Sequence, residues 1–233
     1  MSQVEVEKKF SHVPNKGGWE IPRKTFHYSI GFLVLYLIMS GIRSIDVYPP
    51  LAVFLCIVGT AELLRFNFEW FNQIYCFFLG PLMRPTEIHT RINGVVYYLL
   101  GCVIVLYLFP LDLAAVSIIY LSWTDPTASI CGKLWGKYTF QYGGKSLAGC
   151  LGAAITGGLV TWLYFGPLAR YSLSYHHATS PVPLAALSIY GGLVAAFSEG
   201  VSNVFSLDDN LTIPVISAIL LWIPLVGLGL GGQ

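Results

Sequence analysis

The stretch GVVYYLLGCVIVLYLFPLDLAAVSIIYLSWTDPTASI, residues 94–130, decides the fold of this chain. It holds two apolar runs, residues 94–109 and 113–130, joined by a short segment that contains Pro110 and Asp112. A helix needs about 20 apolar residues to cross a hydrocarbon core of about 30 Å, and each run approaches that length. The pattern therefore predicts two consecutive transmembrane helices.

Similar apolar runs continue on both sides of this stretch. Together they predict seven spans, at residues 28–42, 50–64, 94–109, 113–130, 147–165, 184–198 and 211–228. A further stretch, residues 71–83, is aromatic but short and contains Gly80 and Pro81, which favours an interfacial or re-entrant helix. The predicted fold class is all-α: a polytopic membrane helix bundle of about seven transmembrane helices plus this short helix.

The overall composition agrees with a membrane protein. Hydrophobic residues make up 55% of the chain and charged residues 11%, whereas about 25% of an ordinary soluble domain is charged. The net charge of +1 gives no indication of nucleic-acid binding. The five cysteines show no CxxC spacing, so we expect neither disulfides nor a zinc site.

The distribution of lysine and arginine predicts the orientation of the chain. Basic residues near span ends stay on the cytoplasmic side during insertion. Seven spans with a cytoplasmic N-terminus leave only Arg43 and Arg170 on the far side. The predicted cytoplasmic set is Lys8, Lys9, Lys16, Arg23, Lys24, Arg65, Arg84, Arg91, Lys133, Lys137 and Lys145. An eighth span through residues 71–83 would destroy this asymmetry.

The chain divides into a tail and one membrane domain. Residues 1–18 carry mixed charge without apolar periodicity and are interpreted as a mobile cytoplasmic tail with no cleaved signal peptide. Residues 19–233 form the predicted integral-membrane domain. Within it, small residues at helical spacing, such as Gly149, Gly152 and Gly157, predict close helix packing.

The first cluster of residues that could carry chemistry is WEIPRKTFH, residues 19–27, just before the first span. Pro22 is placed to open a helix, and Lys24 and His27 would share one face of it. A topological anchor would also explain Arg23 and Lys24. The histidine at the mouth of the span favours a functional site.

The second cluster is TDPTASICGKLWGK, residues 124–137, followed by GGKS at residues 143–146. Asp125 lies near the end of an apolar span, where a carboxylate is costly and indicates function. Glycines beside lysines allow backbone amides and ammonium groups to approach phosphates, although the spacing is not that of a Walker loop. The predicted nucleotide-binding residues are Gly132, Lys133, Gly136, Lys137, Lys145 and Ser146. The alternative is that the lysines only fix topology.

The third cluster is acidic and follows the sixth predicted span. Glu199, Asp208 and Asp209, together with Asp125, supply the oxygen ligands that magnesium prefers. Helix capping by Asp209 or Asn210 is the simpler interpretation. Glu62 and Arg65, one turn apart at the end of the second span, are predicted to form a structural ion pair.

These clusters, in this order, resemble the family of CTP-dependent lipid and polyprenol kinases that includes dolichol kinase, phytol kinase and the fungal diacylglycerol kinase. The motifs PRKTFHYSIGF, LMRPTEIHTRINGVVYYLLG, LSWTDPTASICGKLWGK, KSLAGCLGA and SEGVSNVFSLDDNLTIPVIS carry the resemblance, from about residue 19 to residue 217. The match is closest to the CTP-dependent diacylglycerol kinases. Pro126 departs from the pattern, because the family usually has a small residue after this aspartate.

The resemblance implies an activity, a site and a location. It implies phosphoryl transfer from CTP to diacylglycerol in the membrane, and it implicates Arg23, Lys24, Asp125 and Gly132 in activity. The residues themselves supply the rest of the scheme: the carboxylates would hold a divalent cation, Mg²⁺ or Ca²⁺, and His27 or one of the carboxylates would take the hydroxyl proton. The resemblance also implies the endoplasmic reticulum and nuclear membranes, with the active site cytoplasmic. The oligomeric state stays open.

Three alternatives stay open at this stage. A dolichol or other polyprenol kinase would share the nucleotide motifs and differ in its apolar walls. A phosphatidate cytidylyltransferase would release pyrophosphate instead of CDP. A secondary transporter would place its polar residues near the bilayer midplane, whereas here the motifs gather at one predicted membrane face.

Overall fold

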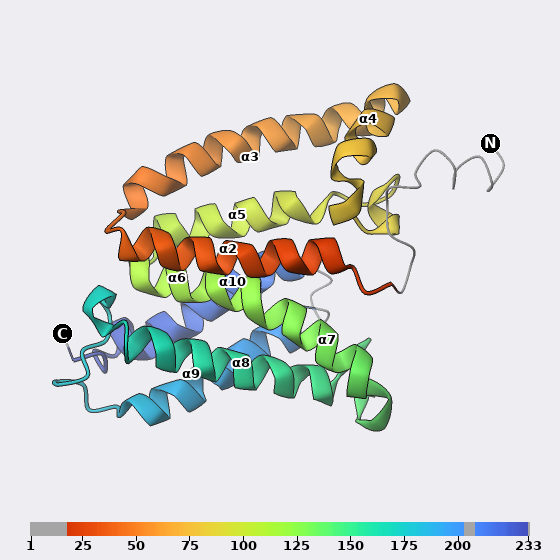
Figure 1. The fold of residues 1–233 in the computed structure, drawn as a ribbon. Coiled ribbons are helices and arrows are strands. Elements are labelled where there is room, and N and C mark those ends of the chain that lie inside the picture. The colour runs from red at the N-terminus through yellow and green to blue at the C-terminus, as the bar shows by residue number, and fades with distance from the viewer. Residues whose placement is uncertain (1–17, 203–207, 233) are drawn as a thin grey trace.

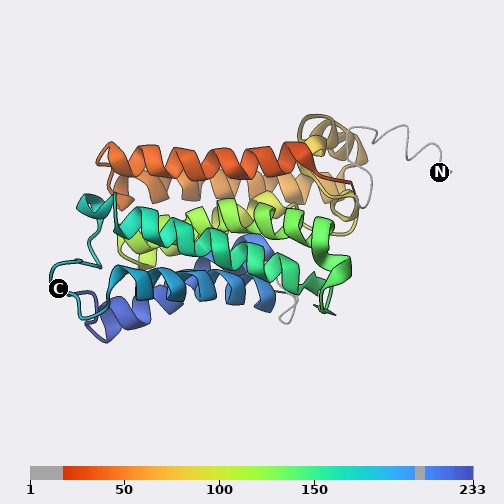
Figure 2. The ribbon, with the colours of Figure 1, turned by 60° about the horizontal axis from the view of Figure 1, so that its bottom comes forward.

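The computed structural model describes residues 18–202 and 208–232, so the predicted tail lies outside the described residues except for Gly18. The chain forms a bundle of helices that run roughly side by side (Figures 1 and 2). The α-helices are α2 (Ile21–Met39), α3 (Ser44–Asn67), α4 (Glu69–Leu79), α5 (Gly94–Leu108), α6 (Leu111–Ile119), α7 (Asp125–Trp135), α8 (Leu147–Phe165), α9 (Leu184–Val201) and α10 (Asp209–Trp222).

Shorter elements complete the fold. Two are π-helical turns, η3 (Tyr120–Thr124) and η6 (Ile223–Gly227). Four are 3₁₀ turns: η1 (Gly80–Leu82), η2 (Pro85–Glu87), η4 (Gly136–Tyr138) and η5 (Ala169–Tyr171). A single two-residue ladder joins β1 (Gln141–Tyr142) to β2 (Lys145–Ser146) among the described residues. The all-α prediction is confirmed apart from this small hairpin.

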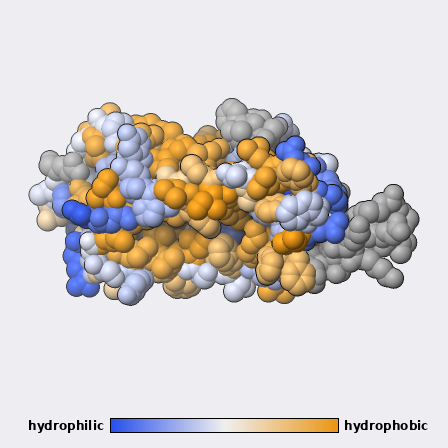
Figure 3. Space-filling view, turned by 90° about the horizontal axis from the view of Figure 1, so that it is seen from above, coloured by the Kyte–Doolittle hydropathy of each residue, from blue (hydrophilic) through white to orange (hydrophobic). Residues whose placement is uncertain are grey.

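The helices fit a polytopic membrane protein. Four of those described are long and apolar enough to cross a membrane by length and composition: Ser44–Asn67, Leu147–Phe165, Leu184–Val201 and Asp209–Gly227. The apolar helix Gly94–Leu108 is shorter. On the face drawn in Figure 3, hydrophobic residues gather over the middle and hydrophilic residues lie towards both ends. The count of seven spans stays a prediction.

The predicted helix starts are right for some elements and late for others. α8 has the predicted bounds, residues 147–165, and α5 begins at Gly94 as expected. α2 begins at Ile21 with Pro22 in its first turn, so the basic motif is helical. The helix that contains the second predicted span begins earlier than Pro50, because α3 begins at Ser44 and carries Pro49 and Pro50 inside it.

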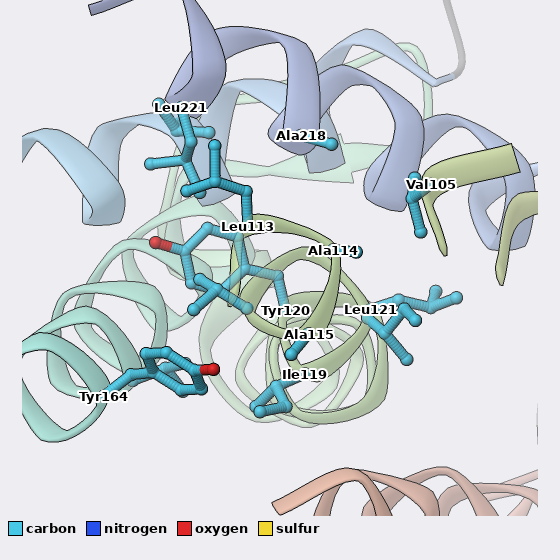
Figure 4. Close-up of a cluster of buried hydrophobic side chains, with 14 of the residues drawn as sticks. Val105, Leu113, Ala114, Ala115, Ile119, Tyr120, Leu121, Tyr164, Ala218 and Leu221 are labelled. Carbon is cyan, nitrogen blue, oxygen red and sulfur yellow. The ribbon is translucent and has the colours of Figure 1, made fainter. Parts of the chain in front are cut away.

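The core centres on α6, which runs through η3 into α7. Almost every residue of α6 is buried, because α2, α5, α8 and α10 surround it. Figure 4 shows Leu113, Tyr120 and Leu121 of this rod beside Tyr164 of α8 and Leu221 of α10. Such dense packing of α6 and η3 fixes the position of Asp125, the first residue of α7.

Small residues bring α8 and α9 close together, as their spacing predicts. A Cβ added to Gly157 would lie 2.4 Å from the Cβ of Ala195, and one on Gly192 would lie 2.5 Å from the carbonyl of Ala154. Both distances are shorter than van der Waals contact. The two backbones therefore approach as small-residue helix interfaces in membranes do.

The end of the bundle formed by residues 110–112 and 166–183 contains a fully satisfied carboxylate. Asp112 accepts hydrogen bonds from the backbone amides of Leu113, Leu173 and Ser174 and from the hydroxyls of Ser172 and Ser174. Its side chain is completely buried. This network anchors the loop after α8 to the start of α6, because a buried charge is stable only when it is hydrogen-bonded.

Candidate functional site

The opposite end of the bundle gathers the charged motifs. In Figure 1 this is the end where α4 lies and where α2, α8 and α10 begin. Arg23, Lys24, His27, Glu87 and Glu199 are all buried there. Burying so many charged groups is costly without a function or full pairing. The three sequence clusters meet at this end.

The basic motif lies on the first turns of α2. Arg23 and His27 are four residues apart, so they project from the same face of the helix. Arg23 NH1 is 3.6 Å from Glu87 Oε1, and His27 Nδ1 is 3.6 Å from Asp125 Oδ2. Lys24 instead donates from Nζ to the Trp19 carbonyl at 2.6 Å. The structure thus joins the first cluster to the aspartate of the second.

Lys145 links the second cluster to the third. Its Nζ donates to Glu199 Oε1 at 2.6 Å and to Asp209 Oδ1 at 3.3 Å. Asp125 lies within electrostatic reach of both carboxylates. Burial by itself would lower the pKa of Lys145, but the two carboxylates outweigh it and raise that pKa to about 12. Lys145 therefore stays charged at any physiological pH.

The glycine pair before Lys145 has a structural explanation. Gly143 and Gly144 have φ values of 57° and 83° and form the two-residue turn between β1 and β2. Two consecutive positive φ angles are typical of a type I′ hairpin and favour glycine. The hairpin directs Lys145 towards α9 and α10.

The other predicted nucleotide-binding residues lie apart from the carboxylates. A Cβ on Gly132 or Gly136 would lie 3.2 or 3.0 Å from Ser146 Oγ, so both glycines form the contact between α7 and the start of α8. Ser146 caps α8 by accepting from the Gly149 amide. Lys133 is exposed and donates to the Gly18 carbonyl.

Lys137 is also exposed, and its Nζ lies 4.6 Å from the centre of the Tyr138 ring. Lys133 and Lys137 therefore occupy the outer side of α7. Of the predicted lysines downstream of Asp125, Lys145 is the one that the structure pairs with the carboxylates.

Sequence analysis missed Arg84 and Glu87, which enter the site from the segment between α4 and α5. Arg84 NH1 is 4.0 Å from Asp208 Oδ2, and Glu87 Oε2 accepts from the Arg84 backbone amide. Burial raises the pKa of Glu87, while nearby Arg23 works against that shift. The run MRPTE carried a signal, since it clusters charges beside an aromatic stretch.

The predicted pair of Glu62 and Arg65 holds this segment in place. Arg65 donates to both carboxylate oxygens of Glu62, at 2.8 and 2.7 Å. Its guanidinium also donates to the carbonyls of Glu87, Ile88 and Arg91. The ion pair is confirmed, and it anchors the loop that presents Arg84 and Glu87.

Asn210 is the third residue that sequence analysis gave no role in the site. The cap of α10 is Asp208, which accepts from the Asn210 amide, and not Asp209 or Asn210 as considered above. The Asn210 side chain is 2% exposed and donates from Nδ2 to the Gly94 carbonyl at 3.2 Å. It therefore joins α10 to the start of α5.

Several buried polar atoms of the site have no hydrogen-bond partner among the described residues. They are Arg23 NH1, His27 Nδ1, Glu199 Oε2 and Asn210 Oδ1. Buried polar atoms are normally satisfied, so a group of exceptions in one place indicates a ligand. The cationic donor of Arg23 suits a phosphate, the carboxylate oxygen of Glu199 suits a cation, and the His27 nitrogen and the Asn210 oxygen suit a hydroxyl.

A divalent cation fits this set only with help from its substrate. Within residues 18–202 and 208–232, no three His, Cys, Asp or Glu side chains are placed to hold a metal. Lys145 lies between Glu199 and Asp209, Asp125 faces His27, and Asp208 faces Arg84. Mg²⁺ usually binds one or two carboxylates plus substrate phosphates, and the free Glu199 oxygen offers one such ligand.

Two cavities of different character lie next to each other at the site. An apolar cavity of about 620 Å³ lies between α2, α3, α5 and α6, and Arg23, His27, Asn93 and Asn210 form its polar end. A polar cavity of about 720 Å³ is lined by Arg84, Glu87, Tyr97, Gly143, Asp208 and Asp209, among others. The Arg23–Glu87 ion pair stands between them, because Arg23 lines the first and Glu87 the second.

The chain is similar over most of its length to proteins of known name. It is 42% identical over 205 residues, 88% of this chain and 93% of the relative, to CTP-dependent diacylglycerol kinase 1 of Schizosaccharomyces pombe. It is 40% identical over 211 residues, 87% of this chain and 72% of the relative, to CTP-dependent diacylglycerol kinase 1 of Saccharomyces cerevisiae. The phytol kinase of Synechocystis sp. is 31% identical over 210 residues, with 87% and 78% covered. No family model and no solved structure matches the chain significantly.

Proposed function

The chain belongs to the family of CTP-dependent diacylglycerol kinases, and from that premise we propose that it transfers the γ-phosphate of CTP to diacylglycerol, giving phosphatidate and CDP. The observation that carries the proposal is that an apolar cavity lined by Arg23 and His27 and a polar cavity lined by Glu87 lie on the two sides of the buried Arg23–Glu87 ion pair. A water-soluble nucleotide and a membrane lipid can approach each other only at such a boundary.

The nucleotide side of the proposal is the polar cavity. Arg84 lines it, and the Lys145 ammonium lies beside Asp209, which also lines it. Phosphoryl transfer depends mainly on positioning and on neutralising charge, so cations around a triphosphate are what the reaction needs. A divalent cation, Mg²⁺ or Ca²⁺, would be held by Glu199 and Asp209 with the phosphates and would neutralise part of their charge.

The reaction itself is a single displacement at phosphorus. The lipid hydroxyl oxygen forms a bond to the γ-phosphorus, and the bond from that phosphorus to the β,γ-bridging oxygen breaks, which releases CDP. We assign Arg23 to the transferred phosphoryl group, because its NH1 makes no hydrogen bond and lies at a non-bonding 3.6 Å from Glu87 Oε1, at the boundary between the cavities. His27 Nδ1 accepts the hydroxyl proton, and Asp125 at 3.6 Å stabilises the resulting imidazolium.

Topology and location extend the same proposal. With seven spans, the site end faces the cytoplasm, where CTP is available, and the acceptor reaches the apolar cavity sideways from the bilayer. We assign the protein to the endoplasmic reticulum and nuclear membranes with a cytoplasmic N-terminus. Its basic residues at the site end, Arg23, Lys24, Arg84 and Lys145, support that orientation.

The test is the variant Asp125→Asn, assayed with labelled CTP and diacylglycerol in mixed micelles. We expect phosphatidate formation to fall at least about 100-fold, because a residue that stabilises the transition state supplies several kcal/mol, while the protein still inserts and purifies. The matched control is Asp46→Asn, an exposed aspartate that pairs with Arg43 in the predicted far-side loop. Full activity in Asp125→Asn would remove that residue from the site.

The same assay separates the alternatives. Release of CDP with phosphatidate supports the kinase, whereas consumption of phosphatidate with release of pyrophosphate would support a cytidylyltransferase. Dolichol and phytol, offered at the same mole fraction as diacylglycerol, test the polyprenol alternative. Phosphorylation of those alcohols in preference to diacylglycerol would reassign the acceptor but keep the nucleotide site.

A further inference from the structure

The polar end of the apolar cavity contains two asparagines in different states. Asn93 is satisfied, because its Oδ1 accepts from the Val95 amide and its Nδ2 donates to the Tyr75 hydroxyl. Asn210 is half satisfied, because Nδ2 donates to the Gly94 carbonyl and Oδ1 has no partner among the described residues. Asn93 therefore has a structural role, and Asn210 keeps one free acceptor.

The orientation of the Asn210 amide is fixed by its surroundings. A carbonyl oxygen accepts but cannot donate, so the group facing the Gly94 carbonyl must be the NH₂ of Asn210. The oxygen then points away from that carbonyl, and the residue lines the apolar cavity beside Arg23 and His27. A buried acceptor left without a donor destabilises the protein, because it has lost its hydrogen bonds to water. A ligand that donates a hydrogen bond there would remove this destabilisation.

We propose that Asn210 Oδ1 accepts a hydrogen bond from the free hydroxyl of the acceptor lipid, and so selects a neutral lipid alcohol. The inference rests on the proposed function and deepens it. Apolar walls hold the hydrocarbon part, and Asn210 holds the hydroxyl oxygen between His27 and Arg23 NH1, which makes no hydrogen bond of its own. In the ground state the single hydroxyl hydrogen is donated to Asn210 Oδ1. An amide oxygen is too weak a base to take the proton, so the O–H rotates towards His27 Nδ1, which takes the proton as the bond to phosphorus forms.

The same oxygen discriminates substrate from product. A diacylglycerol presents a donor hydroxyl, whereas phosphatidate presents acceptor oxygens that would face Asn210 Oδ1 without a hydrogen between them. A site built to bind a hydroxyl rejects analogues that lack it far better than an apolar pocket does. Asn210 thus favours binding of the alcohol and release of the phosphate ester.

The experiment measures lipid binding without CTP, so it does not depend on turnover. Purified protein in micelles is labelled with a photoreactive diacylglycerol, and dioleoylglycerol or its O-methyl ether competes. The wild-type protein should prefer the free alcohol by about fivefold, the effect of one neutral hydrogen bond. In Asn210→Leu, which has no acceptor oxygen, the two competitors should become equal. The matched control is Asn67→Leu, an exposed asparagine at the end of α3.

The outcomes separate the two proposals. A wild-type preference that survives in Asn210→Leu overturns the role of Asn210, even if the protein is an active diacylglycerol kinase. Equal competition in the wild-type protein overturns it as well. Competition by the alcohol without kinase activity would overturn the proposed function and leave the lipid site in place. If Asn210→Leu does not fold, Asn210→Ala is measured in its place with the same expected loss.

Discussion

Gly94 lies in the first turn of α5, and the side chains of two site residues, Asn210 and Arg23, lie directly against it. A Cβ at this position would lie 2.7 Å from Asn210 Nδ2 and 3.0 Å from Arg23 NH2. Both distances are shorter than ordinary contact, so Gly94→Ala must move at least one of the two side chains. Arg23 is long and can shift, but Asn210 is bonded to the carbonyl of Gly94 itself.

The size of the effect follows from this overlap. Overpacking by one carbon costs about 1–3 kcal/mol. If the displaced groups act in the transition state, that energy corresponds to a loss of about 5- to 160-fold in kcat/KM for diacylglycerol. Alanine also reduces the entropy of the unfolded chain relative to glycine by about 0.4–1 kcal/mol, which offsets part of the overpacking, so we expect a modest fall in the thermal midpoint.

The assay compares kcat/KM and thermal unfolding of Gly94→Ala and wild-type protein in the same detergent. Gly59→Ala is the matched control, because Gly59 lies within α3 and an added Cβ there has no heavy atom within 4 Å. Its activity should equal that of the wild-type protein. Wild-type activity in Gly94→Ala would refute the placement of Asn210 and Arg23 at the reacting centre, since the extra carbon cannot be accommodated without moving them.

Two further predictions concern the charged bridge and the apolar cavity. Lys145→Met leaves Glu199 and Asp209 without their cation, so we expect a large loss of activity and a lower thermal midpoint. In the double variant Lys145→Met/Glu199→Gln the thermal midpoint should recover, but the activity should stay low. The pKa of Lys145 is raised to about 12 in the folded protein, above the value of about 10.4 in an unfolded chain. Its ion pairs therefore contribute fully to stability below about pH 10, and this contribution is lost as the pH rises through 12. A titration of Lys145 between pH 6 and 9, seen in activity or stability, would contradict this. Val47 lines the apolar cavity from α3, so Val47→Phe should reduce turnover of dioleoylglycerol more than that of dioctanoylglycerol. The control Val53→Phe, at an exposed position of the same helix, should not show this difference. Equal effects of Val47→Phe on both lipids would exclude this end of the cavity as the site of the acyl chains.

The sequence predicted the helices α5 and α8 and the gathering of the charged motifs at one end well, because both depend on local signals. Apolar length located α5 and α8, and the charge bias placed Arg23, Asp125 and Lys145 at one end. Helical periodicity explains why the predicted nucleotide-binding glycines and lysines of α7 separate in the structure. Gly132 and Gly136 are four residues apart and face α8, so the lysines that follow each of them point about 100° away. Small residues at that spacing indicate packing before they indicate phosphate binding.

The missed residues depend on contacts that no local pattern contains. Asn210 meets the Gly94 carbonyl across 116 positions of sequence, and Arg65 holds the loop of Glu87 across 22. Their partners become neighbours only after the helices pack. A polar residue beside a span shows that something is anchored there, but the identity of its partner comes from the tertiary structure.

The π-helical turn between α6 and α7 sets the rotation of Asp125. Residues 120–124 form a wider turn than an α-helix does, and Asp125 follows directly with Pro126 behind it. Removing one residue from this turn would rotate α7 by about 100° about its axis and would move the Asp125 carboxylate away from His27, although the sequence of every motif would be unchanged. Relatives that keep all the motifs but lack one residue before the aspartate are therefore candidates for inactive homologues, and the spacing between motifs is as diagnostic of an enzyme as the motifs themselves.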